Sequence, residues 1–351
     1  MAPKKNKNYS FPEPIANAQL VGHMAAQSAF MDAFARRDTY PIHPVWILSG
    51  VRGIGKSTLA YRIARFIFKE GNKNLGIDNL NGDLFGEEPT YQSTITDNQS
   101  MDIAAEDHVF QKMLTDGLGD FFIIDIAHNI DKDGRSKPDA KQISVHTIRA
   151  LIEKMQLSSM EGGWRVVLID SLDEMTAAAQ NAMLKLLEEP PASTLFLVVV
   201  HSLAATLPTI RSRSRVEKLH PLTTSEIRDL ARMFLPADEQ DLSPALIKLA
   251  NGSFGRIAGL KKNGGDELYE ELLRICEDPR TNAAEVMTVA AAIARADMAP
   301  ILLDAVAHFG CADLYPIVAR EIIAADKLYL EPEIAAFKVI MKIREVKKNA
   351  D

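Results

Sequence analysis

One run of nine residues limits the folds open to this chain more than any other feature. It consists of Gly50, Val51, Arg52, Gly53, Ile54, Gly55, Lys56, Ser57 and Thr58. The apolar run VWILS at 45–49 precedes it, and apolar residues at helical spacing follow it. A G-x-x-x-x-G-K-S/T loop between a strand and a helix is a phosphate-binding P-loop. We therefore predict an α/β domain with a nucleotide site.

The parts of this motif have separate roles in binding a nucleoside triphosphate. Glycines allow backbone N–H groups to surround an anion, and the N-terminus of the following helix adds partial positive charge. Lys56 is expected to reach the β and γ phosphates, and Ser57 is expected to reach the accompanying Mg²⁺. The loop thus predicts ATP with Mg²⁺ as its ligand. The alternative is a vestigial loop that keeps only the turn.

Apolar runs alternate with helical patterns up to about residue 220. Three runs are unbroken in apolarity, as strands covered on both faces should be: FFIID at 121–125, RVVLID at 165–170 and LFLVVV at 195–200. Helical patterns lie near 145–157 and near 176–189, and the second stops at two prolines. This alternation predicts a mostly parallel sheet with helices on both faces.

Changes in amino-acid composition and in the strand and helix patterns divide the rest of the chain. Residues 70–141 are rich in Gly, Asn, Asp and Thr, which indicates an insertion or an irregular lobe. After Leu219 the strand patterns stop, and Thr223 to Glu226 has the form of a capping box that opens a helix. Because one core rarely exceeds roughly 250 to 300 residues, we expect several domains. We place a P-loop domain at 1–220, a small helical lid at 221–265 and a C-terminal helical domain at 266–351.

Composition excludes several classes of protein. No run approaches the roughly 18 apolar residues of a membrane span, and the polar first residues MAPKKNKNYS exclude a secretory signal peptide. We therefore expect a cytoplasmic protein without a membrane domain. The only two cysteines, Cys276 and Cys311, exclude a four-cysteine zinc site. The net charge of −7 argues against an isolated DNA-binding domain, but not against a DNA-associated assembly.

Two strand-end aspartates compete for the Mg²⁺ ion of the nucleotide. Asp125 has no acid close after it, whereas Asp170 stands on a strand that leads into the second helical pattern. We favour Asp170, with Ser57 as the second metal ligand, and interpret Asp125 as a carboxylate in a turn. In hydrolysing AAA+ ATPases a glutamate follows this aspartate and orients water, but here Ser171 follows. Glu174 is better explained as a charge near a helix N-terminus.

The stretch 162–215 resembles bacterial clamp-loader subunits of the AAA+ class, most closely the delta-prime subunit of DNA polymerase III. The resemblance is carried by NAMLKLLEEPP at 181–191, LPTIRSRS at 207–214 and the strand that ends LID. With the P-loop and NGSFGR at 251–256 it covers about 40–260. It implies an AAA+ module with a parallel sheet flanked by helices, then a small helical lid and an all-helical collar.

The resemblance also implies a hetero-oligomeric assembly that loads the sliding clamp onto primer-template DNA. The implied partners are the ATPase subunit and the clamp-opening delta subunit of the loader, with each ATP at a boundary between subunits. The family's Ser-Arg-Cys motif corresponds to Ser212, Arg213 and Ser214 here. Arg213 is accordingly expected to act as an arginine finger on a neighbour's ATP. A basic surface turn is the alternative interpretation.

The chain departs from the family at several positions. Many members carry a zinc module after the first helix, but 70–141 contain no cysteine, so we expect no zinc. The sensor position after LFLVVV falls on His201 or Ser202, and the sequence does not choose between them. In active loader ATPases an arginine senses the γ phosphate where Gly255 stands here, and Arg256 comes one place later. These departures predict a chain that binds nucleotide but hydrolyses it poorly.

Two other hypotheses remain open at this point. One is an active AAA+ motor, such as the ATPase subunit of a clamp loader or a branch-migration helicase, that uses Lys56 and Asp170 directly. Ser171 argues against it. The other is a small-molecule P-loop kinase, which leaves NAMLKLLEEPP and the Ser-Arg-Ser tripeptide unexplained.

Overall fold

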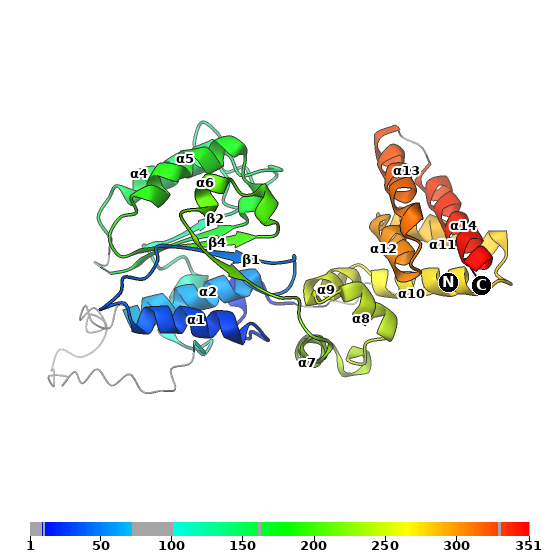
Figure 1. The fold of residues 1–351 in the computed structure, drawn as a ribbon, viewed down its shortest axis with the longest axis horizontal. Helices are drawn as coiled ribbons and strands as arrows, with labels where there is room; N and C mark the ends of the chain where they lie inside the picture. The colour runs from blue at the N-terminus through cyan, green and yellow to red at the C-terminus, as the bar shows by residue number, and fades with distance from the viewer. Residues whose placement is uncertain (1–8, 10, 72–100, 161–162, 329–330, 351) are drawn as a thin grey trace. The chain divides into compact units, whose positions relative to one another are not determined.

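The computed structural model describes residues 9, 11–71, 101–160, 163–328 and 331–350. It contains two compact units (Figure 1). Pro12–Pro221 forms the first, which we call the P-loop unit; the second, the helical unit, joins Tyr9 and Phe11 to the chain from Leu222 onward. Part of the predicted irregular lobe, 72–100, lies outside the described residues, as does the basic start of the chain.

The P-loop unit is built on one parallel sheet of five strands in the order β2-β3-β4-β1-β5. Its strands are β1 (Val45–Ser49), β2 (Phe121–Ile124), β3 (Arg165–Asp170), β4 (Thr194–Val200) and β5 (Arg215–Lys218). Strand β1 is interior, because Ile47 pairs with Val198 of β4 on one side and with Val216 of β5 on the other. The P-loop therefore starts from an interior strand of the sheet.

Helices cover both faces of this sheet, as the unbroken apolar runs predict (Figure 1). Helices α1 (Met24–Ala35) and α2 (Lys56–Phe66) lie on one face, and α4 (Val145–Met155) and α5 (Ala177–Glu188) lie on the other. Every residue of β1 and β4 is buried as a result. The predicted fold class, a P-loop module with a parallel sheet flanked by helices and followed by a helical region, is confirmed.

Side-chain caps explain where the two predicted helices begin. Ser144 accepts hydrogen bonds from the backbone N–H groups at the start of α4, and Thr176 accepts one from Ala179 of α5. The remaining helical elements of the P-loop unit are shorter: η1 (Pro14–Ala16), η2 (Ile67–Gly71), α3 (His108–Leu114), η5 (Leu172–Glu174), η6 (Leu203–Ala205) and α6 (Pro208–Arg211).

The described part of the helical unit contains helices and connecting turns. Its elements are α7 (Thr224–Phe234), η7 (Ala237–Glu239), α8 (Pro244–Ala250), α9 (Phe254–Lys262), α10 (Gly265–Glu277), α11 (Ala283–Arg295), α12 (Pro300–His308), η8 (Ala312–Leu314), α13 (Tyr315–Leu328) and α14 (Pro332–Ala350). The further division into a lid at 221–265 and a collar at 266–351 stays a prediction. Among the described helices, none combines the length and apolarity that crossing a membrane requires.

The capping box at the start of α7 lends itself to a stability test. The Thr223 hydroxyl accepts from the N–H of Glu226 at 3.3 Å, and the Glu226 carboxylate accepts from the N–H of Thr223 at 2.7 Å. Thr223→Ala should lower the free energy of unfolding of the helical unit by about 1 kcal/mol, measured by urea unfolding of the full chain. Thr224→Ala, one position on, is the matched control and should change it by less than about 0.5 kcal/mol. Equal losses in both variants would contradict this account.

Candidate nucleotide site

The predicted site residues follow the carboxyl ends of the parallel strands and therefore lie at one end of the sheet. The P-loop follows β1, His201 follows β4, and Asp170 is the last residue of β3. These three strands are neighbours in the sheet. In open α/β sheets, ligands bind at the carboxyl ends of the strands. The arrangement thus places the loop, the metal-site candidate and the sensor candidate around one location.

Two glycines of the P-loop are required by its shape. Gly55 has φ of +99°, a left-handed conformation that side chains disfavour, and it is the residue directly before α2. At Gly50, an added Cβ would lie 2.6 Å from the carbonyl oxygen of Leu219. Because α2 begins at Lys56, the free N–H groups of its first turn belong to the loop itself. The predicted residues from Gly50 to Thr58 therefore form one continuous loop and helix start, with a shape that suits an anion.

Lys56 is buried inside this loop, with 3% of its surface exposed. Its ammonium group donates to the carbonyl oxygens of Gly50 at 2.8 Å and Val51 at 2.7 Å. Burial lowers the pKa of Lys56 to about 8, against the opposing effect of the Asp170 carboxylate. A desolvated cation beside free backbone donors favours an anionic ligand, and phosphate satisfies both.

The lowered pKa of Lys56 predicts a pH dependence of nucleotide binding. Above about pH 8 a growing share of the free chain holds a neutral amine, whereas bound phosphates favour the charged form. Binding should therefore take up a proton, and the affinity for Mg-ATP should fall up to about tenfold per pH unit above that value. Isothermal titration calorimetry in two buffers of different ionisation enthalpy measures both effects. An affinity that stays constant between about pH 7 and pH 10 would contradict this assignment of Lys56.

Ser57 and Asp170 lie together at the loop. Burial raises the pKa of Asp170, and a hydrogen bond with the Ser57 side chain acts in the opposite direction. A hydroxyl and a carboxylate are the oxygen donors that Mg²⁺ prefers, so the two predicted metal ligands fit the ion of a bound nucleotide. The other strand-end candidate, Asp125, accepts hydrogen bonds at 2.7 Å from both the backbone N–H and the ring Nδ1 of His128. That is the turn geometry expected of it.

The position that would orient a water molecule for hydrolysis holds Ser171 in place of a glutamate, and two acids follow it. Ser171 is buried, and its hydroxyl has no hydrogen-bond partner within the described part of the chain. Asp173 accepts from the backbone N–H groups of His201 at 2.6 Å and Ser202 at 2.9 Å, so it fixes the end of β4. Glu174 forms an ion pair at 3.7 Å with Arg52 of the P-loop. Glu174 ends the short turn η5, which precedes α5, so it lies near a helix N-terminus as the helix-charge interpretation requires.

His201 is better placed than Ser202 to respond to a ligand. Burial lowers the pKa of its imidazole, and the nearby charge of Lys56 lowers it further. The ring is therefore neutral at physiological pH. Its Nδ1 atom is buried without a partner among the described residues, whereas the Ser202 backbone is bound to Asp173.

The structure places Arg213 away from the P-loop of its own chain. Arg215, two residues later, pairs in register with Trp46 near the start of β1, whereas the P-loop follows the end of β1. Arg213 therefore lies at the opposite end of the sheet, where β1 begins. Its side chain is 39% exposed and bonds to the Glu188 carboxylate at 2.8 Å and to the Thr209 carbonyl at 3.0 Å.

The helical unit holds the remaining sensor candidate. Arg256 and Gly255 lie in the first turn of α9, and Arg256 forms an ion pair with Asp304 of α12. The guanidinium of Arg256 is thus engaged within its own unit.

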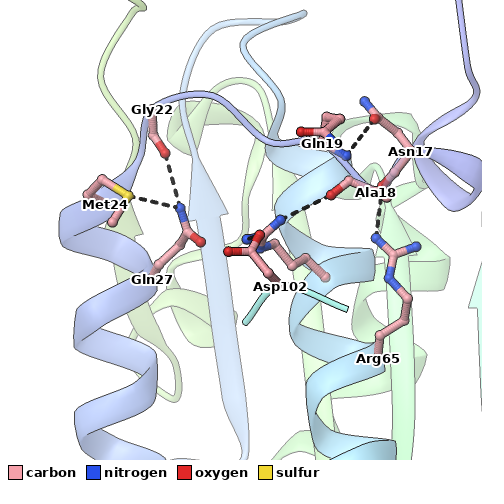
Figure 2. Close-up of polar contacts among 9 residues, drawn as sticks. Asn17, Ala18, Gln19, Gly22, Met24, Gln27, Arg65 and Asp102 are labelled. Carbon is pink, nitrogen blue, oxygen red and sulfur yellow. Dashed lines mark hydrogen bonds and ion pairs between the residues drawn. The ribbon is translucent and has the colours of Figure 1, made fainter. Parts of the chain in front are cut away.

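Sequence reasoning missed a segment that lies against the P-loop. The chain from Ile15 to His23, which we call the strap, is bound through its backbone carbonyls by two buried arginines of α2, Arg62 and Arg65 (Figure 2). His23 at the end of the strap hydrogen-bonds the carbonyl of Ile54 at 2.7 Å. A signal was present, since Arg62 and Arg65 interrupt an otherwise apolar stretch of the helix.

Comparisons with known proteins show what the chain is similar to. Residues 92–223 match the family model described as DNA polymerase III, delta subunit. The chain is 29% identical over 216 residues to the DNA polymerase III subunit gamma of Buchnera aphidicola subsp. Schizaphis graminum, covering 60% of this chain and 49% of that protein. It is 28% identical over 174 residues to the subunit delta' of Yersinia pestis, covering 49% and 40%.

A solved structure extends this list. A DNA polymerase III gamma subunit-related protein from Thermotoga maritima matches with a TM-score of 0.44 and 15% identity, covering 91% of this chain and 99% of that chain. The chain spans less than half the length of the two curated relatives above. The family model and the delta-prime and gamma relatives agree: over the residues that they match, the chain is similar to clamp-loader subunits of DNA polymerase III.

Proposed function

We propose that this chain is a delta-prime-type subunit of a clamp loader, which holds a nucleotide passively and supplies Arg213 to the ATP of a neighbouring subunit. One observation carries the proposal: the P-loop and the predicted finger Arg213 lie at opposite ends of the strands of one sheet. An arginine so placed cannot serve the nucleotide of its own chain. It is free to serve another.

The nucleotide would be held by groups that already face the loop. The backbone N–H groups of the P-loop and Lys56 bind the phosphates, and Ser57 and Asp170 hold the metal ion. Mg²⁺, when bound, neutralises phosphate charge. His201 stands beside Lys56 and offers a neutral ring nitrogen to the ligand or its water.

Turnover in this site is proposed to be weak because a general base is missing from the required position. The Ser171 hydroxyl cannot accept a proton from water at neutral pH. Of the two acids that follow it, Asp173 is bound to the backbone at the end of β4, and Glu174 lies three residues past Ser171. Hydrolysis needs a group that orients the attacking water in addition to a phosphate cradle.

Arg213 would act by electrostatic stabilisation. A guanidinium next to the γ phosphate stabilises the negative charge that spreads over the phosphoryl oxygens in the transition state. In the single chain Arg213 is paired with Glu188, and both side chains are about 40% exposed. Such a surface pair is worth about 0–1 kcal/mol, so a neighbour's phosphates could replace Glu188 at little cost.

The proposed setting is a cytoplasmic hetero-oligomer. Its other members are the ATPase subunit and the clamp-opening delta subunit, and through them the chain would meet the sliding clamp and primer-template DNA. The second candidate is an active motor, favoured by the intact set of Lys56, Ser57 and Asp170, which lie together at the P-loop.

Co-purification tests the proposed place in an assembly. The chain is expressed together with the ATPase and delta subunits of its own loader, with an affinity tag on the ATPase subunit. All three should elute as one complex during size exclusion. A loader that assembles fully without this chain, while the chain elutes alone as a folded monomer, would contradict the proposal.

A further inference from the structure

Two buried arginines on the P-loop helix have no part in the function described so far. Arg62 is 6% exposed and Arg65 is 2% exposed. Burying a charged group is costly unless its hydrogen bonds are satisfied. By helix geometry Arg65 lies about 14 Å along α2 from Lys56, too far to bind phosphate itself.

Both side chains bind the same segment. Arg65 donates at 2.9 Å to the carbonyl oxygens of Ile15 and of Asn17, and its guanidinium lies 4.3 Å from the ring centre of Phe110. Arg62 donates at 3.1 Å to the carbonyl of Ala18 and forms an ion pair with Asp102 (Figure 2). Three carbonyls of the strap are thus fastened to the body of α2.

The other end of the strap is fastened to the P-loop and to α1. The Gln27 amide donates to the Gly22 carbonyl at 3.1 Å (Figure 2), and the His23 ring bonds the Ile54 carbonyl at 2.7 Å. The Leu20 side chain lies 3.3 Å from the point where a Cβ on Gly55 would stand. The strap therefore reaches from the C-terminal end of α2 back to the peptide that precedes Gly55.

We propose that Arg62 and Arg65 are positioning residues for the nucleotide site, which hold the strap so that His23 fixes the P-loop at Ile54. This inference rests on the proposed binding of nucleotide by the loop. The Ile54 carbonyl and the Gly55 N–H belong to one planar peptide group. Fixing the first therefore orients the second toward the anion.

The geometry calls for arginine at position 65. The planar fork of a guanidinium satisfies two carbonyls at fixed angles, as the bonds to Ile15 and Asn17 show. Burial lowers the pKa of Arg65 to about 10, so it remains charged at neutral pH. Lysine would keep the positive charge but could not donate to both carbonyls with the planar geometry of a guanidinium.

A double-mutant cycle tests this role through the affinity for ATPγS, measured by calorimetry on the full chain. Arg65→Gln and His23→Ala should each weaken binding about tenfold, and the double variant should bind no more weakly than the weaker single variant. The exposed Arg149→Gln on α4 is the matched control and should bind like the wild type. If Arg65→Gln does not fold, Arg65→Lys replaces it in the cycle.

Each other outcome overturns the inference. Wild-type affinity in the position 65 variant would show that the strap does not position the loop. Additive losses in the double variant would show that Arg65 and His23 act separately. A wild-type chain that binds no ATPγS, like Lys56→Ala, would overturn the proposed function and the positioning role together.

Discussion

Replacing Arg213 with alanine is expected to slow ATP turnover about 10³-fold at the one site of a reconstituted loader that this arginine serves. The reason is the loss of a positive charge that stabilises the transition state of phosphoryl transfer. Single-turnover hydrolysis by the assembled loader measures the loss. The affinity of the isolated chain for nucleotide should not change, since Arg213 lies at the opposite end of the sheet from its own P-loop.

Arg211→Ala is the matched control for this experiment. Arg211 is exposed, stands two residues before Arg213 and belongs to the same basic turn. It should leave turnover within about twofold, because general attraction of phosphate by surface charge is screened by salt. If both variants slow the loader equally, the turn is only a basic surface. If neither does, Arg213 is not a finger.

Lys56→Ala is expected to weaken nucleotide binding by the isolated chain about 10- to 150-fold. A charged hydrogen bond contributes about 1.5–3 kcal/mol, and Lys56 is the buried cation of the loop. Calorimetric titration with Mg-ATP gives the affinities, and Lys154→Ala on the exposed side of α4 should match the wild type.

The same substitution separates the two candidate roles of the chain. A loader assembled with the Lys56→Ala variant should keep most of its ATPase activity, because this site is proposed to be passive. Loss of nearly all loader turnover would instead assign catalysis to this chain.

The central strands could be predicted because their surroundings are uniform. A strand such as β4, covered on both faces, must be apolar throughout, and the run from Leu195 to Val200 shows this directly. Strand β5 could not be predicted in this way. Its sequence, RVEK, lies at the edge of the sheet and is only partly buried, so it has neither an apolar run nor an alternation. Pairing with β1, which sequence patterns do not reveal, makes it a strand.

Part of the candidate nucleotide site could likewise be predicted from local sequence signals, and part of it could not. The P-loop and Asp170 are local signals, because one depends on a short motif and the other on the end of an apolar strand. The contacts of Arg65 with Ile15 and Asn17 join residues about fifty positions apart. The ion pair of Arg52 with Glu174 also depends on how distant loops meet. Such contacts follow from the fold and leave no periodic pattern in the sequence.

Steady-state ATPase activity of the purified chain tests the central claim most directly. With saturating Mg-ATP, with and without primer-template DNA, the wild type should show no turnover above that of the Lys56→Ala variant, although it binds the nucleotide. Robust turnover that the Lys56→Ala substitution abolishes would contradict a passive site and would identify the chain as a motor.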